Sequence, residues 1–184
     1  MTRQPEFDEL TDEQALVYCA GSEKQRVRAR CAEIVGPRQV LDLGCGNGID
    51  AERYATTQYV GIDRSPALIR AARHLHPRHT FACRLDAHFA AYRPAVTVIK
   101  SVLEHLASEA DAIGLLRSAR SRTGGEVLVA WHTPPVAEVT QIRQVPGHCY
   151  QDLPPGTWER LALAQASGGV QVIEDAYAAT AREL

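Results

Sequence analysis

The sequence of 184 residues contains no apolar run of about 18 residues, the length that a membrane-spanning helix requires. The segment Met1 to Gln14 is polar and acidic, so we expect neither a signal peptide nor a membrane anchor there. The net charge is −2 and like charges form no run, so no large basic surface is expected. Nucleic acid is therefore not favoured as a partner.

Cysteine is scarce and irregularly spaced. Five cysteines occur, an odd number, and no C-x-x-C pair is among them. This argues against both a disulfide framework and a zinc site. We expect a reducing, cytoplasmic setting in which most thiols are buried as small hydrophobic groups. The cysteines are Cys19, Cys31, Cys45, Cys83 and Cys149.

The composition and the order of predicted elements indicate one α/β domain. Hydrophobic residues make up 45% and charged residues 23%, which is ordinary for a globular protein. Residues 10–35 are predicted as two helices broken at 20–22. Alternating strands and helices follow, and this pattern predicts a mostly parallel sheet with helices on both faces. The predicted strands are residues 39–43, 58–62, 79–83, 95–100 and 125–131, and the predicted helices between them are residues 48–55, 66–75 and 107–120.

A glycine-rich turn follows the first predicted strand. Residues 40–48 read Val-Leu-Asp-Leu-Gly-Cys-Gly-Asn-Gly, and glycines between a strand and a helix let a ligand approach the backbone without side chains in the way. A dinucleotide-binding turn needs a small residue where Ile49 stands, and a carboxylate at Asp42 would repel a pyrophosphate. The turn therefore favours a cationic ligand such as S-adenosylmethionine over NAD.

Five segments, in order across residues 40–131, resemble the class I S-adenosylmethionine-dependent methyltransferases. Each segment alone is a weak signal, and their order makes the resemblance specific. The resemblance implies a doubly wound, mostly parallel, seven-stranded sheet, usually with the seventh strand antiparallel beside the fifth. The segments are the glycine turn at 40–48, Val60-Gly61-Ile62-Asp63, Leu85-Asp86-Ala87, the stretch 98–106 and the Gly-Gly turn with its strand at 123–131.

The resemblance also implies where the cofactor binds. Asp63 would accept both ribose hydroxyls, as an acid about 20 residues beyond the turn does in dinucleotide folds, and Asp86 would accept a hydrogen bond from the adenine amino group. In the structural alternatives, Asp42 caps the turn, while Asp63 and Asp86 begin helices. The implied cofactor-binding residues are Asp42, Gly44, Cys45, Gly46, Asp63, Arg64, Asp86, Ala87, Lys100 and Ser101.

We expect the single domain, residues 1–184, to have four parts. Residues 1–36 form an N-terminal helical cap, in which Tyr18 and Arg26 are candidates to close over the cofactor, and residues 37–131 form the cofactor-binding core. Residues 132–156 contain five prolines and no clear period, so we interpret this long connection as a substrate lid. Residues 157–184 are predicted to hold a helix at 157–167, a strand at 170–175 and a last strand, short or absent, at 177–182.

Methyl transfer from a sulfonium depends mainly on alignment, with the reacting atoms held about 3–3.5 Å apart. A general base is needed only if the acceptor must lose a proton, and histidine is the natural choice near neutral pH. Glu104 and His105 could belong to a metal site, but Ser101 stands where such a site has its first acid, so we expect no metal. The candidate catalytic residues are His105, His132, His148 and Tyr150, each of which has a solvated or packing residue as its alternative.

The predicted function is that of a cytoplasmic methyltransferase that uses S-adenosylmethionine and acts on a small molecule. Residues 100–103 read Lys-Ser-Val-Leu, where enzymes that methylate nucleic-acid bases or glutamine amides carry an Asn/Asp-Pro-Pro-aromatic tetrapeptide. Two alternatives stay open. The protein could catalyse another reaction of the sulfonium, such as aminopropyl transfer or ring closure, or it could bind the cofactor without catalysis.

Overall fold

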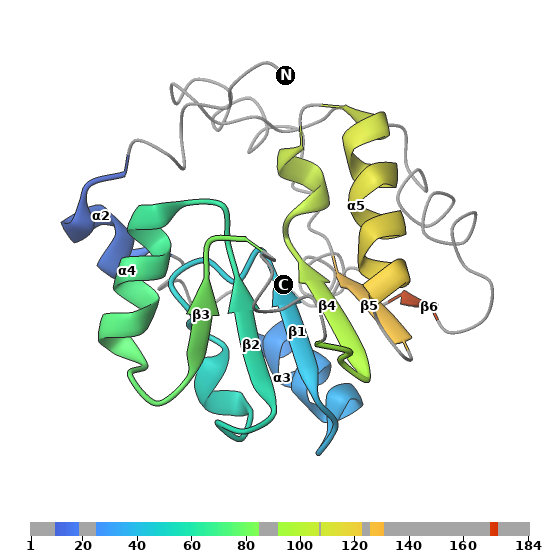
Figure 1. Ribbon diagram of the computed structural model, residues 1–184, viewed down its shortest axis with the longest axis horizontal. Helices are drawn as coiled ribbons and strands as arrows, with labels where there is room; N and C mark the ends of the chain where they lie inside the picture. The colour runs from blue at the N-terminus through green and yellow to red at the C-terminus, as the bar shows by residue number, and fades with distance from the viewer. Residues whose placement is uncertain are drawn as a thin grey trace, which may run out of the picture.

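Six parallel strands form one sheet in the part of the chain that the computed structural model describes, residues 10–18, 25–84, 92–106, 108–122, 126–130 and 170–172. Their order is β3-β2-β1-β4-β5-β6, and each neighbouring pair is parallel (Figure 1). This arrangement confirms the predicted doubly wound α/β fold. The strands are β1 (Val40–Leu43), β2 (Tyr59–Ile62), β3 (Thr80–Ala82), β4 (Val96–Lys100), β5 (Glu126–Ala130) and β6 (Val170–Val172).

Helices cover both faces of the sheet. Among the described helices, those that pack on it are α3 (Gln25–Val35), α4 (Pro66–Leu75) and α5 (Glu109–Arg122). On one face, Leu116 of α5 belongs to the same buried cluster as Leu41 of β1. On the opposite face, Val35 of α3 and Ile69 of α4 share a cluster with Val40. Successive strand residues point to opposite faces, so the continuous apolar run of β1 is buried between both helical layers.

Helix α4 begins and ends where the sequence predicts, at residues 66–75. Its N-cap residue Ser65 accepts a hydrogen bond from the backbone nitrogen of Leu68 at 3.4 Å. Pro66 occupies the first helical position, where a missing N–H leaves no hydrogen bond unmade. Local capping chemistry therefore sets the residue at which this helix begins.

The predicted helix over residues 48–55 is wrong. Gly48 has a φ of +75°, a left-handed conformation that cannot begin a right-handed helix. Asp50 makes no capping hydrogen bond, and only the short 3₁₀ helix η1 (Ala51–Arg53) forms before Tyr54 becomes extended. The turn therefore extends further along the chain than its glycine spacing predicts.

The N-terminal helical cap begins with a capping box. The Thr11 hydroxyl accepts a hydrogen bond from the Gln14 nitrogen at 3.2 Å, and the Gln14 side chain accepts one from the Thr11 nitrogen at 2.9 Å. The helix that follows, α2 (Asp12–Val17), packs against α4 (Figure 1). The predicted break at residues 20–22 lies outside the described residues.

At the other end of the sheet, β6 lies beside β5 and parallel to it, with Val127 paired to Val170. It therefore occupies the position that the resemblance gives to an antiparallel seventh strand. The predicted lid at 132–156, the helix at 157–167 and the last strand at 177–182 lie outside the described residues. Of the helices that the structure describes, none combines the length and the apolar character that crossing a membrane would take.

Candidate functional site

A cavity of about 310 Å³ lies at the carboxyl ends of β1, β2 and β4, within the range of about 300–1,000 Å³ that is typical of small-molecule sites. Strand β1 has β2 on one side and β4 on the other, so the cavity lies at the topological switch point, where doubly wound sheets bind ligands. The predicted site residues that line it are Asp42, Gly44, Cys45, Gly46, Asp63, Arg64, Lys100, Ser101 and His105. The others, Asp86, Ala87, His132, His148 and Tyr150, lie outside the described residues.

The three glycines of the turn all have positive φ angles, but their surroundings differ. A Cβ atom on Gly44 (φ +80°) would lie 2.2 Å from Cγ2 of Val102, and one on Gly48 would lie 2.7 Å from Cζ of Phe81. A Cβ atom on Gly46 (φ +57°) would meet only an aromatic ring carbon at 3.7 Å, an ordinary contact. Packing within the protein therefore requires glycine at Gly44 and Gly48, whereas Gly46 leaves its backbone open toward the cavity.

Asp63 fixes this turn from the end of β2. Its carboxylate accepts hydrogen bonds from the backbone nitrogens of Gly46 and Ser65, each at 2.9 Å. Burial raises the pKa of the Asp63 carboxyl above its usual value, although both backbone donors favour the charged form. An ionised carboxylate offers about four lone-pair sites, so Asp63 can still accept hydrogen bonds from a ligand in the cavity.

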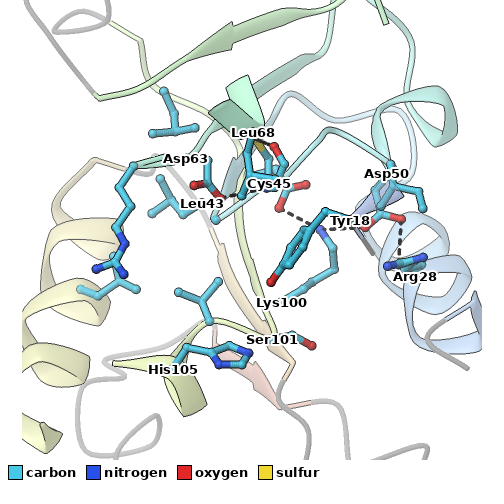
Figure 2. A pocket seen from close by; sticks show the side chains of 18 of the residues that line it. Tyr18, Arg28, Leu43, Cys45, Asp50, Asp63, Leu68, Lys100, Ser101 and His105 are labelled. Carbon is cyan, nitrogen blue, oxygen red and sulfur yellow. Dashed lines mark hydrogen bonds and ion pairs between the residues drawn. The ribbon is translucent and has the colours of Figure 1, made fainter. Parts of the chain in front are cut away.

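A group of buried charges lies at the opposite side of the cavity. The Lys100 ammonium is 2.8 Å from Oδ1 of Asp42 and 3.5 Å from Oδ2 of Asp50, and Nε of Arg28 is 3.6 Å from Oδ1 of Asp50. The other oxygen of Asp42 accepts a hydrogen bond from the Tyr59 hydroxyl at 3.0 Å. Figure 2 shows Arg28, Asp50 and Lys100 together, joined by ion pairs. We call these three residues and Asp42 the charge cluster.

Strand alternation explains why Lys100 meets Asp42. Val98 and Lys100 lie two residues apart in β4, so both point to the same face. Asp42 is paired in register with Val98, and its side chain also points to that face. Burial alone would lower the pKa of the Lys100 ammonium, but the carboxylates of Asp42 and Asp50 outweigh burial and hold that pKa well above its usual value. Lys100 is therefore positively charged inside the protein.

The charge cluster corrects one part of the sequence interpretation. Asp42 is only 2% exposed and is neutralised by Lys100, so it is not a free carboxylate facing a cationic ligand. Sequence reasoning did not identify Arg28 or Asp50 as site residues. A signal for Arg28 exists, because it shares a face of α3 with the buried Cys31, three residues on. A buried charged side chain needs a partner of opposite charge.

The described cysteines differ in their surroundings. Cys45, in the glycine turn, is buried, and burial raises the pKa of its thiol well above the usual value. Burial also raises the pKa of the Cys31 thiol, to about 11. Cys83 lines the cavity, is half-buried and carries a free thiol. Cys45 lines the cavity, and its backbone nitrogen donates a hydrogen bond to the Ile62 carbonyl at 3.1 Å. Its buried thiol with a raised pKa is a poor nucleophile.

We expect iodoacetamide to modify Cys83 well before Cys31 and Cys45. A pKa of about 11 leaves Cys31 with about one hundredth of the thiolate of an ordinary cysteine, since each pKa unit is a factor of ten. Mass spectrometry of a variant in which Cys19 and Cys149 are serine measures the three rates. Equal rates in the folded protein would contradict the burial of Cys31 and Cys45.

Ser101, an expected cofactor-binding residue, and His105, the candidate catalytic residue that the structure describes, both lie at the end of β4. Ser101 has a φ of +50°, rare for a residue other than glycine, and such strain is often found at functional sites. His105, in the 3₁₀ helix η3 (Leu103–His105), is half-buried and lines the same cavity. Tyr18 also lines it. In the described part of the chain, no group of three or more His, Cys, Asp or Glu side chains is placed to hold a metal ion.

Sequence comparisons show that this chain is similar to methyltransferases. A family model described as a methyltransferase domain matches residues 17–166. Trans-aconitate 2-methyltransferase of Methylobacterium radiotolerans is 35% identical over 82 residues, which cover 42% of this chain and 32% of that protein. Ribosomal protein L11 methyltransferase of Stenotrophomonas maltophilia is 29% identical over 96 residues, covering 50% of this chain and 31% of that protein. The chain thus matches about a third of the length of these curated relatives.

Solved structures show the same fold. Magnesium protoporphyrin IX methyltransferase of Synechocystis PCC 6803, solved with bound S-adenosylhomocysteine, has a TM-score of 0.58 at 16% identity, covering 78% of this chain and 73% of that one. A methyltransferase of Streptomyces caelestis has a TM-score of 0.55 at 20% identity, covering 69% of this chain and 57% of that one. These likenesses support the doubly wound architecture.

Proposed function

The chain belongs to the methyltransferase-domain family, and from this premise we propose that it transfers the methyl group of S-adenosylmethionine to a small-molecule acceptor. One observation carries the proposal. The open backbone of Gly46, the carboxylate of Asp63 and the charge cluster all meet one cavity at the switch point of the sheet. Each of these features matches a different part of that cofactor.

The residues that line the cavity fit the two ends of the cofactor. Asp63 would accept hydrogen bonds from the ribose hydroxyls, and the apolar side chain of Leu68 lines the same cavity for the adenosine. The amino-acid end of S-adenosylmethionine carries both an ammonium and a carboxylate. Asp50 would face the ammonium, while Arg28 and Lys100 would face the carboxylate, so the mixed signs of the charge cluster suit this end.

Bound S-adenosylmethionine supplies a methyl group on a positively charged sulfur, which is already an activated leaving group. The task of the protein is then to orient both reactants and to exclude water. Ser101 and His105, at the end of β4, line the cavity, and we propose that they contact the acceptor. His105 is the described candidate for a general base. His132, His148 and Tyr150 stay candidates from the sequence.

A small acceptor, as opposed to a nucleic acid, is supported by the net charge of −2, which gives no large basic surface. The relative that acts on trans-aconitate, by its name, points the same way. A protein acceptor is the second candidate, since another relative is named for ribosomal protein L11. The free thiols of Cys31, Cys45 and Cys83 favour a reducing compartment such as the cytoplasm.

Binding of S-adenosylmethionine should weaken as the pH falls from neutral. The ionised form of Asp63 accepts the ribose hydroxyls, and burial raises the pKa of this carboxyl. The dissociation constant should therefore begin to rise at a higher pH than the usual aspartate pKa of about 3.9 would give. The raised pKa of Asp63 also affects stability. Above that pKa the buried, ionised carboxylate lowers the free energy of unfolding, and this loss diminishes as the pH falls through the raised pKa.

Calorimetric titrations over this pH range, within the limits where the protein stays folded, measure the dependence. Repeating them in buffers of different ionisation enthalpy counts the protons released on binding. A dissociation constant that is flat with pH would contradict the role of Asp63.

The reaction is tested by the fate of the cofactor. The protein is incubated with S-adenosylmethionine, alone and with a panel of small carboxylic acids, amines and phenols, and the products are separated by chromatography. The proposal predicts S-adenosylhomocysteine only when an acceptor is present. Methylthioadenosine would indicate a different reaction of the sulfonium. The same incubation is then repeated with L11-type protein acceptors. If the protein binds the cofactor but forms no product with any acceptor, a binding module is favoured.

A further inference from the structure

The Asn47 side chain connects the glycine turn to the N-terminal helical cap. It is only 3% exposed. Its amide nitrogen lies 3.2 Å from the carbonyl oxygen of Ala15, 3.2 Å from that of Leu16 and 2.6 Å from that of Tyr18. An asparagine amide has two N–H groups, so one of them is shared between two carbonyls. Three surrounding acceptors also fix which way the amide group points.

These carbonyls belong to the last turn and the C-cap of α2, where a helix has few partners for its carbonyl groups along the chain. Of the three, that of Ala15 also accepts a hydrogen bond from the Tyr18 nitrogen, at 3.4 Å. Helix α2 has six residues, too few to be stable alone in water, so its position depends on what it contacts. Ala15 packs with Ala67, Leu68 and Ala71 of α4 in one buried cluster. The exposed ion pair between Asp12 and Arg70 adds little. The hydrogen bonds of Asn47 are directional contacts that help to fix the end of α2.

The residue at that end is Tyr18, which lines the cavity. A Cβ atom on Gly46 would meet the ring of Tyr18 at 3.7 Å, so the ring lies directly beside the open backbone of the turn. Figure 2 shows Tyr18 among the side chains that line the cavity. Asn47 is thus bonded to the segment that carries this wall of the cavity, one residue from Gly46.

We propose that Asn47 is a positioning residue for the cofactor: its amide holds the end of α2 so that Tyr18 completes the cavity wall beside Gly46. The proposal rests on the proposed function for the identity of the ligand. The glycine turn and the helical cap are then one unit, and a ligand that contacts both Gly46 and Tyr18 stabilises their junction. Asn47 itself touches neither the reacting atoms nor the acceptor.

The test uses Asn47→Asp in the full chain. The substitution keeps the size of the side chain and places a carboxylate against three carbonyl oxygens, which repels the end of α2. Hydrogen exchange followed by mass spectrometry should show faster exchange over residues 15–18 and unchanged exchange in β1 and β4. The dissociation constant for S-adenosylmethionine should rise about tenfold or more, as expected for losing one to two net hydrogen bonds. Saturating cofactor should slow exchange over residues 15–18 by a larger factor than elsewhere in the described part of the chain, whereas general stabilisation of the fold by a bound ligand would slow all segments alike.

Arg70→Ala is the matched control, since it removes the exposed link between α2 and α4, and it should leave the dissociation constant unchanged. Tyr18→Ala should weaken cofactor binding in a chain whose Asn47 is intact, and it keeps the proposal testable if Asn47→Asp does not fold. Unchanged exchange and unchanged affinity in Asn47→Asp, or full affinity in Tyr18→Ala, would overturn the proposal. A wild-type protein that binds no S-adenosylmethionine would instead defeat the proposed function, while the exchange data would still report on Asn47.

Discussion

Replacing Lys100 by methionine should lower the free energy of unfolding by about 3–5 kcal/mol, the usual effect of leaving a buried charge without its partner. Lys100 stands between Asp42, at 2.8 Å, and Asp50, at 3.5 Å. Both carboxylates are buried, at 2% and 5% exposure, so water cannot replace the ammonium without opening the structure. Urea unfolding of the wild type and of Lys100→Met at neutral pH measures the difference.

The double variant Lys100→Met with Asp42→Asn is the matched control. An asparagine at Asp42 can still accept the hydrogen bond of Tyr59, and it no longer places a negative charge beside methionine. We expect this double variant to be more stable than Lys100→Met alone. A loss below about 1 kcal/mol in Lys100→Met, the size of an exposed ion pair, would show that the charge cluster is solvated.

Alanine at Gly44 should be far more damaging than alanine at Gly46. Both positions have left-handed φ angles, of +80° and +57°, so each substitution strains the backbone by about 1–2 kcal/mol. At Gly44 the new Cβ would also lie 2.2 Å from Val102 Cγ2, which adds about 1–3 kcal/mol of overpacking. The two unfolding free energies, measured side by side, should differ by that second amount.

Val102→Ala combined with Gly44→Ala separates the two causes. Shortening Val102 removes the clash and leaves the backbone strain, so the double variant should recover part of the lost stability. Equal stability of Gly44→Ala and Gly46→Ala would contradict the packing of the turn against Val102.

Much of the fold could be predicted from the sequence because local signals decided it. The apolar run of β1 and the Ser65-Pro66 start of α4 contain their own structural information, and both elements lie where they are predicted. The prediction of a helix over 48–55 failed. The residues are compatible with a helix, but Gly48 has a left-handed φ and cannot be its first residue. The space beside Gly48 is filled by Phe81, which is distant in the sequence, so local sequence does not reveal this packing.

The candidate site likewise has parts that the sequence predicts and parts that it does not. Asp63 and the glycine turn could be placed because strand ends and spacing locate them. The charge cluster could not, because it depends on the register between β1 and β4 and on the rotation of α3. Asn47 was missed for a similar reason, since its partners at the end of α2 are about thirty residues away in the chain.

The central claim is that one cavity, bounded by Gly46, Asp63 and the charge cluster, binds S-adenosylmethionine. Its most direct test is a calorimetric titration of the wild-type protein with S-adenosylmethionine, with NAD and with Asp63→Ala as comparisons. We predict saturable binding of S-adenosylmethionine at one site, no comparable binding of NAD, and affinity at least about tenfold weaker in Asp63→Ala, the loss of one charge-assisted hydrogen bond. No binding at millimolar S-adenosylmethionine, or equal affinity in Asp63→Ala, would contradict the claim.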